Sequence, residues 1–106
     1  MLSTHRKPTL PGKILLEEFL TPLEITQIEF VLHLGGTWTQ PKLSATIRGK
    51  RSITEEIALD FADALGTSAE FWIGLQMDVS LWEAKQRNTI PLIKRSRGRR
   101  KVKAFS

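Results

Sequence analysis

The sequence predicts an all-α domain of five helices followed by a basic C-terminal tail. Five amphipathic segments are separated by turn or cap signals, and no stretch of the body alternates apolar and polar residues with period two. The 106 residues are enough for one domain, and cysteine is absent, so the fold must depend on packing. We expect an N-terminal extension over residues 1–10, the helical domain over residues 11–87 and the tail over residues 88–106.

The first two expected helices follow from proline and cap signals. The first begins at Pro11, which suits a first turn because its missing N–H costs nothing there. Pro22 marks its last turn or its end. The second begins at Thr26, where Glu29 can complete a capping box, and stops at the glycine pair 35–36. The apolar positions expected to bury the first helix are Ile14, Leu15, Leu16, Phe19, Leu20 and Leu23.

The third expected helix is short and runs from an N-cap at Thr39 to about Arg48. Leu43 and Ile47 are four residues apart, so they must face inward together. Two short helices joined by a glycine turn are the plan of a helix-turn-helix, in which the second helix enters the major groove of DNA. The side chains left to face outward or toward the flanks are Gln40, Lys42, Ser44, Ala45 and Arg48.

The last two helices carry most of the aromatic residues. The fourth starts after Thr54 and closes at Gly66, and the fifth starts at a capping-box pattern over residues 67–70. We expect Phe71 in the core. Because aromatic side chains often anchor interfaces, we expect a dimer interface at Trp72, Val79 and Trp82.

Charge is unevenly distributed along the chain, whose formal net charge is +5. All 11 acidic residues lie before residue 84, whereas residues 91–106 hold seven basic residues and no acidic one. The stretch between Glu29 and Glu55 also lacks acidic residues, and it contains Lys42, Arg48, Lys50 and Arg51. Segregated basic charge is expected of a protein that meets a polyanion, so we expect the tail to contact DNA phosphates.

The residue types around the third helix suit a DNA interface. Glutamine can pair with adenine through two hydrogen bonds, and lysine and arginine reach guanine or phosphate. Small side chains allow close approach to the bases, and the start of the second helix can donate to a phosphate. The predicted DNA-binding residues are Thr26, Gln27, Thr39, Gln40, Lys42, Ser44, Ala45, Arg48, Lys50 and Arg51.

Three blocks of the sequence resemble the HigA/VapI antitoxin family of the Xre, or lambda-repressor-like, helix-turn-helix superfamily. They are residues 11–20 with Thr26-Gln27, residues 49–54, and residues 64–72 with Leu75-Gln76, so the resemblance covers roughly residues 8–84. It implies a homodimer that represses its own operon at an inverted-repeat operator and binds a RelE-like or HigB-like toxin, an mRNA endonuclease.

The resemblance also implies roles for single residues. Gln27 would contact a phosphate, Lys50 and Arg51 would meet the DNA backbone, and the base-reading positions would be Gln40, Pro41, Lys42, Ser44 and Ala45. Three positions depart from the family pattern. Glu24 stands in place of a usual glycine, which suggests a different turn, and Val31 replaces a small residue. Trp38 lies in a loop about two residues longer than usual.

Other functions remain open at this point. The chain could be an interaction module that binds a toxin without reading DNA, a stand-alone phage-type repressor, or an RNA-binding protein with a basic tail. No nucleophile–base pair, phosphate loop or metal-ligand cluster is visible, so we expect no enzyme, cofactor or metal. No apolar run reaches the roughly 18 residues that cross a bilayer, and no secretory signal is visible, so we expect a cytoplasmic protein with no membrane partner.

Overall fold

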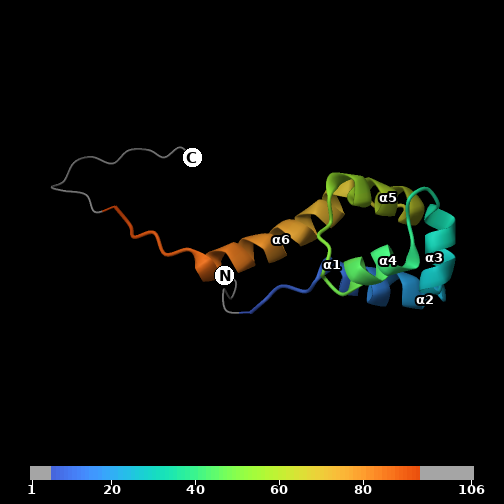
Figure 1. Cartoon of the computed structure of the whole chain (residues 1–106), viewed down its shortest axis with the longest axis horizontal. Coiled ribbons are helices and arrows are strands. Elements are labelled where there is room, and N and C mark those ends of the chain that lie inside the picture. Colours follow the sequence, from blue (N-terminus) through green and yellow to red (C-terminus); the bar gives the residue numbers. More distant parts are fainter. Residues whose placement is uncertain (1–5, 94–106) are drawn as a thin grey trace.

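The computed structural model describes residues 6–93, and all regular structure within that range is helical (Figure 1). α1, η1 and α2 follow one another without a break, so they form one helical segment, and the prediction of five helices is confirmed. The expectations for residues 1–5 and 94–106 lie outside the described residues. The elements are α1 (Pro11–Ile14), the π-helical η1 (Leu15–Leu20), α2 (Thr21–Leu23), α3 (Gln27–Leu34), α4 (Gln40–Ile47), α5 (Glu55–Leu65) and α6 (Ala69–Arg87).

The π-helical stretch in the first segment is a feature that the apolar pattern did not predict. The Thr21 N–H donates to the Leu16 carbonyl five residues back, and Pro22, which follows, has no N–H to give to the ladder. Residues five apart lie on different sides of a regular α-helix, but hydrogen bonds from i to i+5 bring them closer to one face. Leu15 and Leu20 are thereby both fully buried, whereas Leu23 is 55% exposed and is not the core residue that we expected.

Side-chain caps set the starts of the four later helices. The hydroxyls of Thr26, Thr39 and Thr54 each accept a hydrogen bond from the backbone N–H three residues further on, as the sequence predicts. The cap of α6 is Ser68, because the hydroxyl of Thr67 instead accepts a hydrogen bond from the indole Nε1 of Trp72 at 2.7 Å. The capping box that we expected at residues 67–70 therefore does not form.

Glu24 closes the first helical segment in a left-handed conformation, with φ of 58°. This is the conformation that glycine adopts most easily and that other residues adopt at a cost. The turn to α3 thus has the backbone shape of a glycine turn, although the sequence places a glutamate there.

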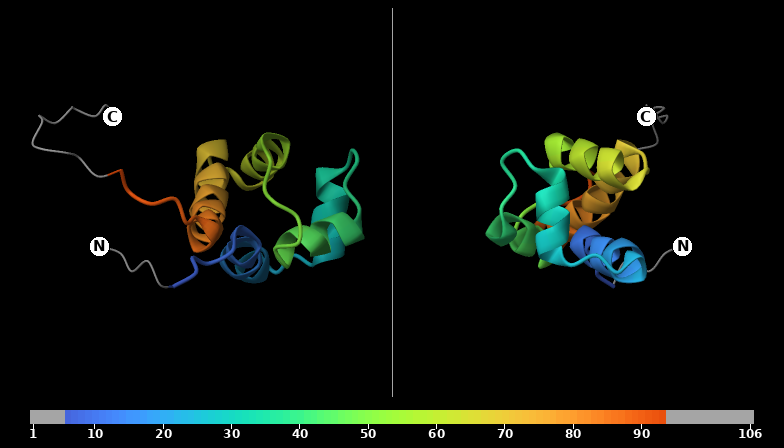
Figure 2. Two further views of the ribbon diagram at one scale, coloured as in Figure 1. Left: turned by 60° about the vertical axis from the view of Figure 1, so that its left-hand side comes forward. Right: turned by 90° about the vertical axis from the view of Figure 1, so that its right-hand side faces the viewer.

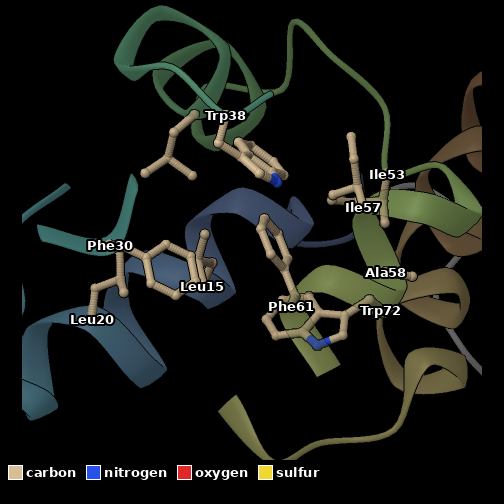
Figure 3. Packing of buried hydrophobic residues seen from close by; sticks show 10 residues of the cluster. Leu15, Leu20, Phe30, Trp38, Ile53, Ile57, Ala58, Phe61 and Trp72 are labelled. Carbon is tan, nitrogen blue, oxygen red and sulfur yellow. The ribbon is translucent and has the colours of Figure 1, made fainter. Parts of the chain in front are cut away.

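The core is built around aromatic rings from four parts of the chain (Figure 3). Phe61 of α5 lies at its centre, with ring centroids 5.8 Å from Phe30, 5.6 Å from Trp38 and 5.2 Å from Trp72. Because these rings come from α3, the α3–α4 loop, α5 and α6, the cluster fixes α3 and α4 against the rest of the domain.

Two of the three residues predicted for a dimer interface are buried within the monomer. Trp72 is fully buried and Val79 is 2% exposed, so neither side chain is available to a second copy. Trp72 packs against Phe61 of the core, and Val79 is buried further along the same helix. Phe71, which we expected in the core, is 40% exposed, and Trp82 is half-buried.

α6 is the longest helix and extends away from the bundle on the side opposite α3 (Figures 1 and 2). Its first half packs on α5, and its last turns project beyond the other helices. Residues 88–93 follow without regular structure. Within residues 6–93, no helix is both long and apolar enough to span a membrane.

Candidate nucleic-acid interface

The position of α4 is set at its C-terminal end by direct contact with the backbone of α1. Gly12 is buried, and a Cβ atom at this position would lie 2.3 Å from the Cα of Ile47 and 2.4 Å from the carbonyl oxygen of Thr46. No side chain fits in that space, so glycine allows the two helices to touch. Sequence reasoning did not single out Gly12, which entered only as a member of the first matched block.

The inner face of α4 contains a residue that the apolar pattern missed. Leu43 is fully buried and Ile47 is half-buried, as predicted. Thr46, which is polar, is buried as well, with an exposed fraction of 1%. Its hydroxyl donates to the Lys42 carbonyl at 2.9 Å, so the polar group is satisfied inside its own helix and can be buried at low cost. Leu43, Thr46 and Ile47 together define the side of α4 that faces the domain.

The opposite side of α4 presents polar and small side chains to solvent. Gln40 and Arg48 are exposed, and Ser44 and Ala45 between them are half-exposed. Gln40, Ser44 and Arg48 are spaced four residues apart and therefore share one stripe. The guanidinium of Arg48 donates to the hydroxyl of Ser44, so the cation lies along this stripe. We call the surface formed by Gln40, Ser44, Ala45 and Arg48 the outer face of α4.

Lys42 does not belong to the outer face, although the sequence grouped it with these residues. Its ammonium lies 4.3 Å from the centroid of the Trp38 ring and 3.5 Å from the hydroxyl of Thr37. Lys42 is half-buried and points back to the loop that precedes α4. The positive charge at the start of α4 is therefore held by an aromatic ring, which favours a cation over its face.

The start of α3 combines two predicted phosphate-contact residues with an acidic neighbour. The hydroxyl of Thr26 accepts from the Glu29 N–H at 3.1 Å, and the Thr26 N–H donates to the Glu29 carboxylate at 2.9 Å. The backbone N–H of Thr26 is thus engaged inside the capping box, whereas its hydroxyl proton can still be donated. Gln27, half-exposed in the first turn of α3, adds its side-chain amide and a helix-start N–H.

Lys50 and Arg51 are exposed in the loop that connects α4 to α5. The Lys50 N–H donates to the Ala45 carbonyl at 2.9 Å, and the Ile53 N–H donates to the side-chain oxygen of Gln76 in α6 at 2.8 Å. Gln76 therefore holds the loop that follows α4, a role that sequence reasoning missed because its partner is a backbone group 23 positions away.

Two short helices, with the second held by its neighbours and exposing a polar outer face, define a protein of the helix-turn-helix class. Among solved structures, an antitoxin HigA of Pseudomonas aeruginosa with the higBA promoter superposes with a TM-score of 0.70. It is 31% identical, and the match covers 82% of this chain and 100% of that one. An addiction module antidote protein of a HigA family from Coxiella burnetii gives a TM-score of 0.69 at 32% identity, over 77% of this chain and 87% of that one.

Sequence relatives lead to the same family, although no family model matches the chain. Antitoxin HigA-1 of Vibrio cholerae is 34% identical over 87 residues, which are 82% of this chain and 80% of the relative. The uncharacterised HTH-type transcriptional regulator YbaQ of Escherichia coli K12 is 39% identical over 87 residues, which are 80% of this chain and 74% of the relative. The chain belongs to the HigA family of helix-turn-helix antitoxins, and the resemblance and fold class predicted from its sequence are confirmed.

Proposed function

We propose that this chain is an antitoxin and repressor that binds an inverted-repeat operator as a homodimer and neutralises a RelE-like mRNA endonuclease. The observation that carries the DNA-binding part is the outer face of α4, where Gln40 and Arg48 are exposed on one stripe. Two similar proteins of known structure support it: the antitoxin HigA of Pseudomonas aeruginosa, solved with the higBA promoter, and the protein PA4674 of the same organism, solved in complex with its operator DNA.

In this proposal α4 lies in the major groove and α3 lies across the phosphate backbone. Gln40 pairs with adenine, Arg48 reaches guanine or an adjacent phosphate, and Ala45 contacts a thymine methyl group. Gln27 and the hydroxyl of Thr26 donate to a phosphate at the start of α3. Lys50 and Arg51 extend the backbone contact beyond the end of α4. Lys42 contributes its charge from the loop side of α4, because Trp38 holds its ammonium there.

The homodimer would use the outer part of α6 rather than the two buried residues of the sequence prediction. Met77 and Leu81 are four residues apart, and they are 59% and 53% exposed. Trp82 lies beside them and is half-buried. An apolar stripe on a projecting helix suits a two-fold contact, and operator binding requires that this contact place the two copies of α4 about 34 Å apart, one turn of DNA. Sedimentation should therefore give a dimer, and Met77→Glu with Leu81→Glu should give a folded monomer. A monomeric parent protein would contradict this part.

A gel shift with the DNA upstream of the chain's own gene tests operator binding. We expect binding that is at least tenfold tighter than to a scrambled duplex of the same length, and Gln40→Ala with Arg48→Ala should abolish the difference. Glu70→Ala on α6 serves as a matched surface control and should leave the difference between the two affinities unchanged. Equal binding to both duplexes by the parent protein would remove the base-reading role of α4.

Toxin neutralisation is tested by co-expression with a small open reading frame adjacent to the gene. We expect the two products to purify as one complex and the cells to survive expression of the neighbour only when this chain is present. Operator binding without such a complex would favour the stand-alone repressor. A complex without operator binding would favour the interaction module.

Residues 94–106 of the basic tail, which lie outside the described residues, would add phosphate contacts to those of the domain. Deleting residues 94–106 should flatten the dependence of binding on salt, by up to about 0.9 of log–log slope for each phosphate that the tail neutralises. An unchanged slope would mean that the tail does not bind DNA. Tighter binding to structured RNA than to duplex DNA, abolished by removing the tail, would favour the RNA-binding alternative.

A further inference from the structure

The loop between α3 and α4 contains one side chain that enters the core. Trp38 is only 7% exposed, although its neighbours Thr37 and Thr39 are exposed. Its ring stacks on Phe61 of α5 at a centroid distance of 5.6 Å and an angle of 27° (Figure 3). Thr39, the next residue, is the N-cap of α4, so whatever fixes the indole also fixes the first turn of α4.

A directed hydrogen bond sets the orientation of the indole. Its Nε1–H donates to the Oδ2 atom of Asp60 at 2.8 Å, and Asp60 is on α5, 22 positions further along the chain. Stacking alone allows a ring to slide, whereas a hydrogen bond at one edge selects one placement. Because the acceptor is a carboxylate, this bond is stronger than one between neutral groups.

The same indole holds a charge of α4. Lys42 lies in the first turn of α4, four residues after Trp38. Its ammonium is 4.3 Å from the centroid of the Trp38 ring and 3.5 Å from the hydroxyl of Thr37. Lys42, Trp38 and Asp60 thus form a chain of contacts from α4 through the loop to α5. The three groups are a cation, an aromatic ring and an anion. The contact between the ammonium and the ring and the contact between the indole N–H and the carboxylate are both electrostatically favourable.

Resting on the proposed function of α4, we propose that Trp38 and Asp60 are positioning residues for sequence recognition. They fix the angle at which α4 begins and the place of the Lys42 ammonium, and neither needs to touch DNA. Breaking the Trp38–Asp60 hydrogen bond lets the start of α4 move. Base-edge contacts require fixed geometry, whereas contacts to phosphates tolerate movement, so discrimination between sequences falls more than overall DNA affinity.

Five variants of the full chain test this role: Asp60→Ala, Asp60→Asn, Trp38→Phe, the double variant of Trp38→Phe with Asp60→Ala, and Asp63→Ala. Asp60→Asn retains an acceptor, and Trp38→Phe retains a ring but removes the N–H donor. Asp63 is exposed on the same helix as Asp60 and controls for the removal of one negative charge. Each is titrated with the promoter duplex and with a scrambled duplex at several salt concentrations, and its folded state is checked by circular dichroism.

The measured quantity is the ratio of the affinity for the promoter duplex to the affinity for the scrambled duplex. A smaller folded fraction lowers both affinities equally, so it does not change this ratio. We expect Asp60→Ala and Trp38→Phe each to reduce the ratio about tenfold, which corresponds to about 1.4 kcal/mol. The double variant should be no worse than either single one, since both remove the same bond. Asp60→Asn should stay within about threefold of the parent, and Asp63→Ala should not change the ratio. The salt slope should be equal in all five.

Two results would overturn the positioning role while leaving the proposed function intact. One is a parent protein that discriminates between the duplexes and an Asp60→Ala variant that discriminates equally well. The other is an Asp63→Ala variant that loses as much discrimination as Asp60→Ala, which would assign the effect to charge. A parent protein that does not discriminate contradicts the proposed function itself, and the positioning role falls with it.

Discussion

The two ends of α4 are held in different ways. At the C-terminal end, Gly12 lets the backbone of α1 touch the backbone of α4 at a spacing that excludes even a methyl group. At the N-terminal end, the contact is made by a side chain, since Trp38 reaches from the loop to Phe61 and Asp60. Backbone contact leaves no freedom for substitution, whereas a side-chain contact can be altered in steps. We therefore expect substitutions at the C-terminal end to act mainly on the stability of the domain, and substitutions at the N-terminal end to act mainly on how α4 is presented.

The largest effect is expected for Gly12→Ala. The new methyl group would overlap backbone atoms of Thr46 and Ile47, which cannot rotate away as a side chain can. Overpacking of this kind costs about 3 kcal/mol, and more if the helices separate. Urea unfolding measures it. Gly74→Ala in α6 is the matched control, because a Cβ there meets no atom within 4 Å, and it should stabilise the fold by about 0.5–1 kcal/mol. Similar effects at both glycines would refute backbone contact at Gly12.

Gln76→Leu should lower the free energy of unfolding by about 2 kcal/mol, less than Gly12→Ala does, because the partly buried Ile53 N–H would lose its acceptor. The loop after α4 would loosen as a result, and amide hydrogen exchange of Ile53 should speed up. Gln76→Glu keeps an oxygen acceptor and should retain most of the protection of this amide. If Gln76→Leu leaves the exchange rate of Ile53 unchanged, α6 does not hold the C-terminal end of α4.

Thr39→Ala removes the N-cap at the other end of α4. The Lys42 N–H would lose the hydroxyl that accepts its hydrogen bond at 3.2 Å, at a cost of about 1 kcal/mol in the free energy of unfolding. Thr39→Ser keeps the hydroxyl and should lose little. A larger destabilisation by Thr39→Ala than by Gly12→Ala would show that the N-terminal end of α4 matters more for folding.

The smallest effect, and a stabilising one, is expected for Glu24→Gly. Glu24 has a left-handed backbone, which costs a residue with a side chain about 1–2 kcal/mol. Glycine would relieve this cost, but its greater freedom in the unfolded chain offsets part of the gain in stability. The net gain should be at most about 1 kcal/mol, seen as a higher thermal midpoint. Glu24→Ala removes the charge but keeps the Cβ atom, so it should not be stabilising. Equal gains from both substitutions would point to charge instead.

Local signals in the sequence predicted most of the fold. Cap residues and glycines mark where helices start and stop because they act within a few residues, and Thr26, Thr39 and Thr54 are caps as expected. The outer face of α4 followed from the placement of Leu43 and Ile47 inside. The π-helical turn was missed because it depends on how Leu15 and Leu20 meet the core, and periodicity assumes a regular helix.

Long-range contacts explain what could not be predicted. α6 is rich in large apolar residues, so its sequence did not reveal which side faces α5, and Trp72 and Val79 were placed at an interface although they are buried. The sequence comparison presents Trp38 only as part of a loop about two residues longer than usual, but a tryptophan between polar loop residues is itself a signal of core anchoring. Asp60 and Gly12 act through partners more than 20 positions away, which no local pattern encodes.

The most direct test of α4 as the reading helix is protection of guanine N7 atoms, which lie in the major groove, from methylation on the promoter DNA. We predict two protected windows with centres about one helical turn apart, and their disappearance with Gln40→Ala and Arg48→Ala together while the protein stays folded. Protection that persists in the double variant, or tight specific binding with no protected guanine in a site that contains them, would contradict the role of α4.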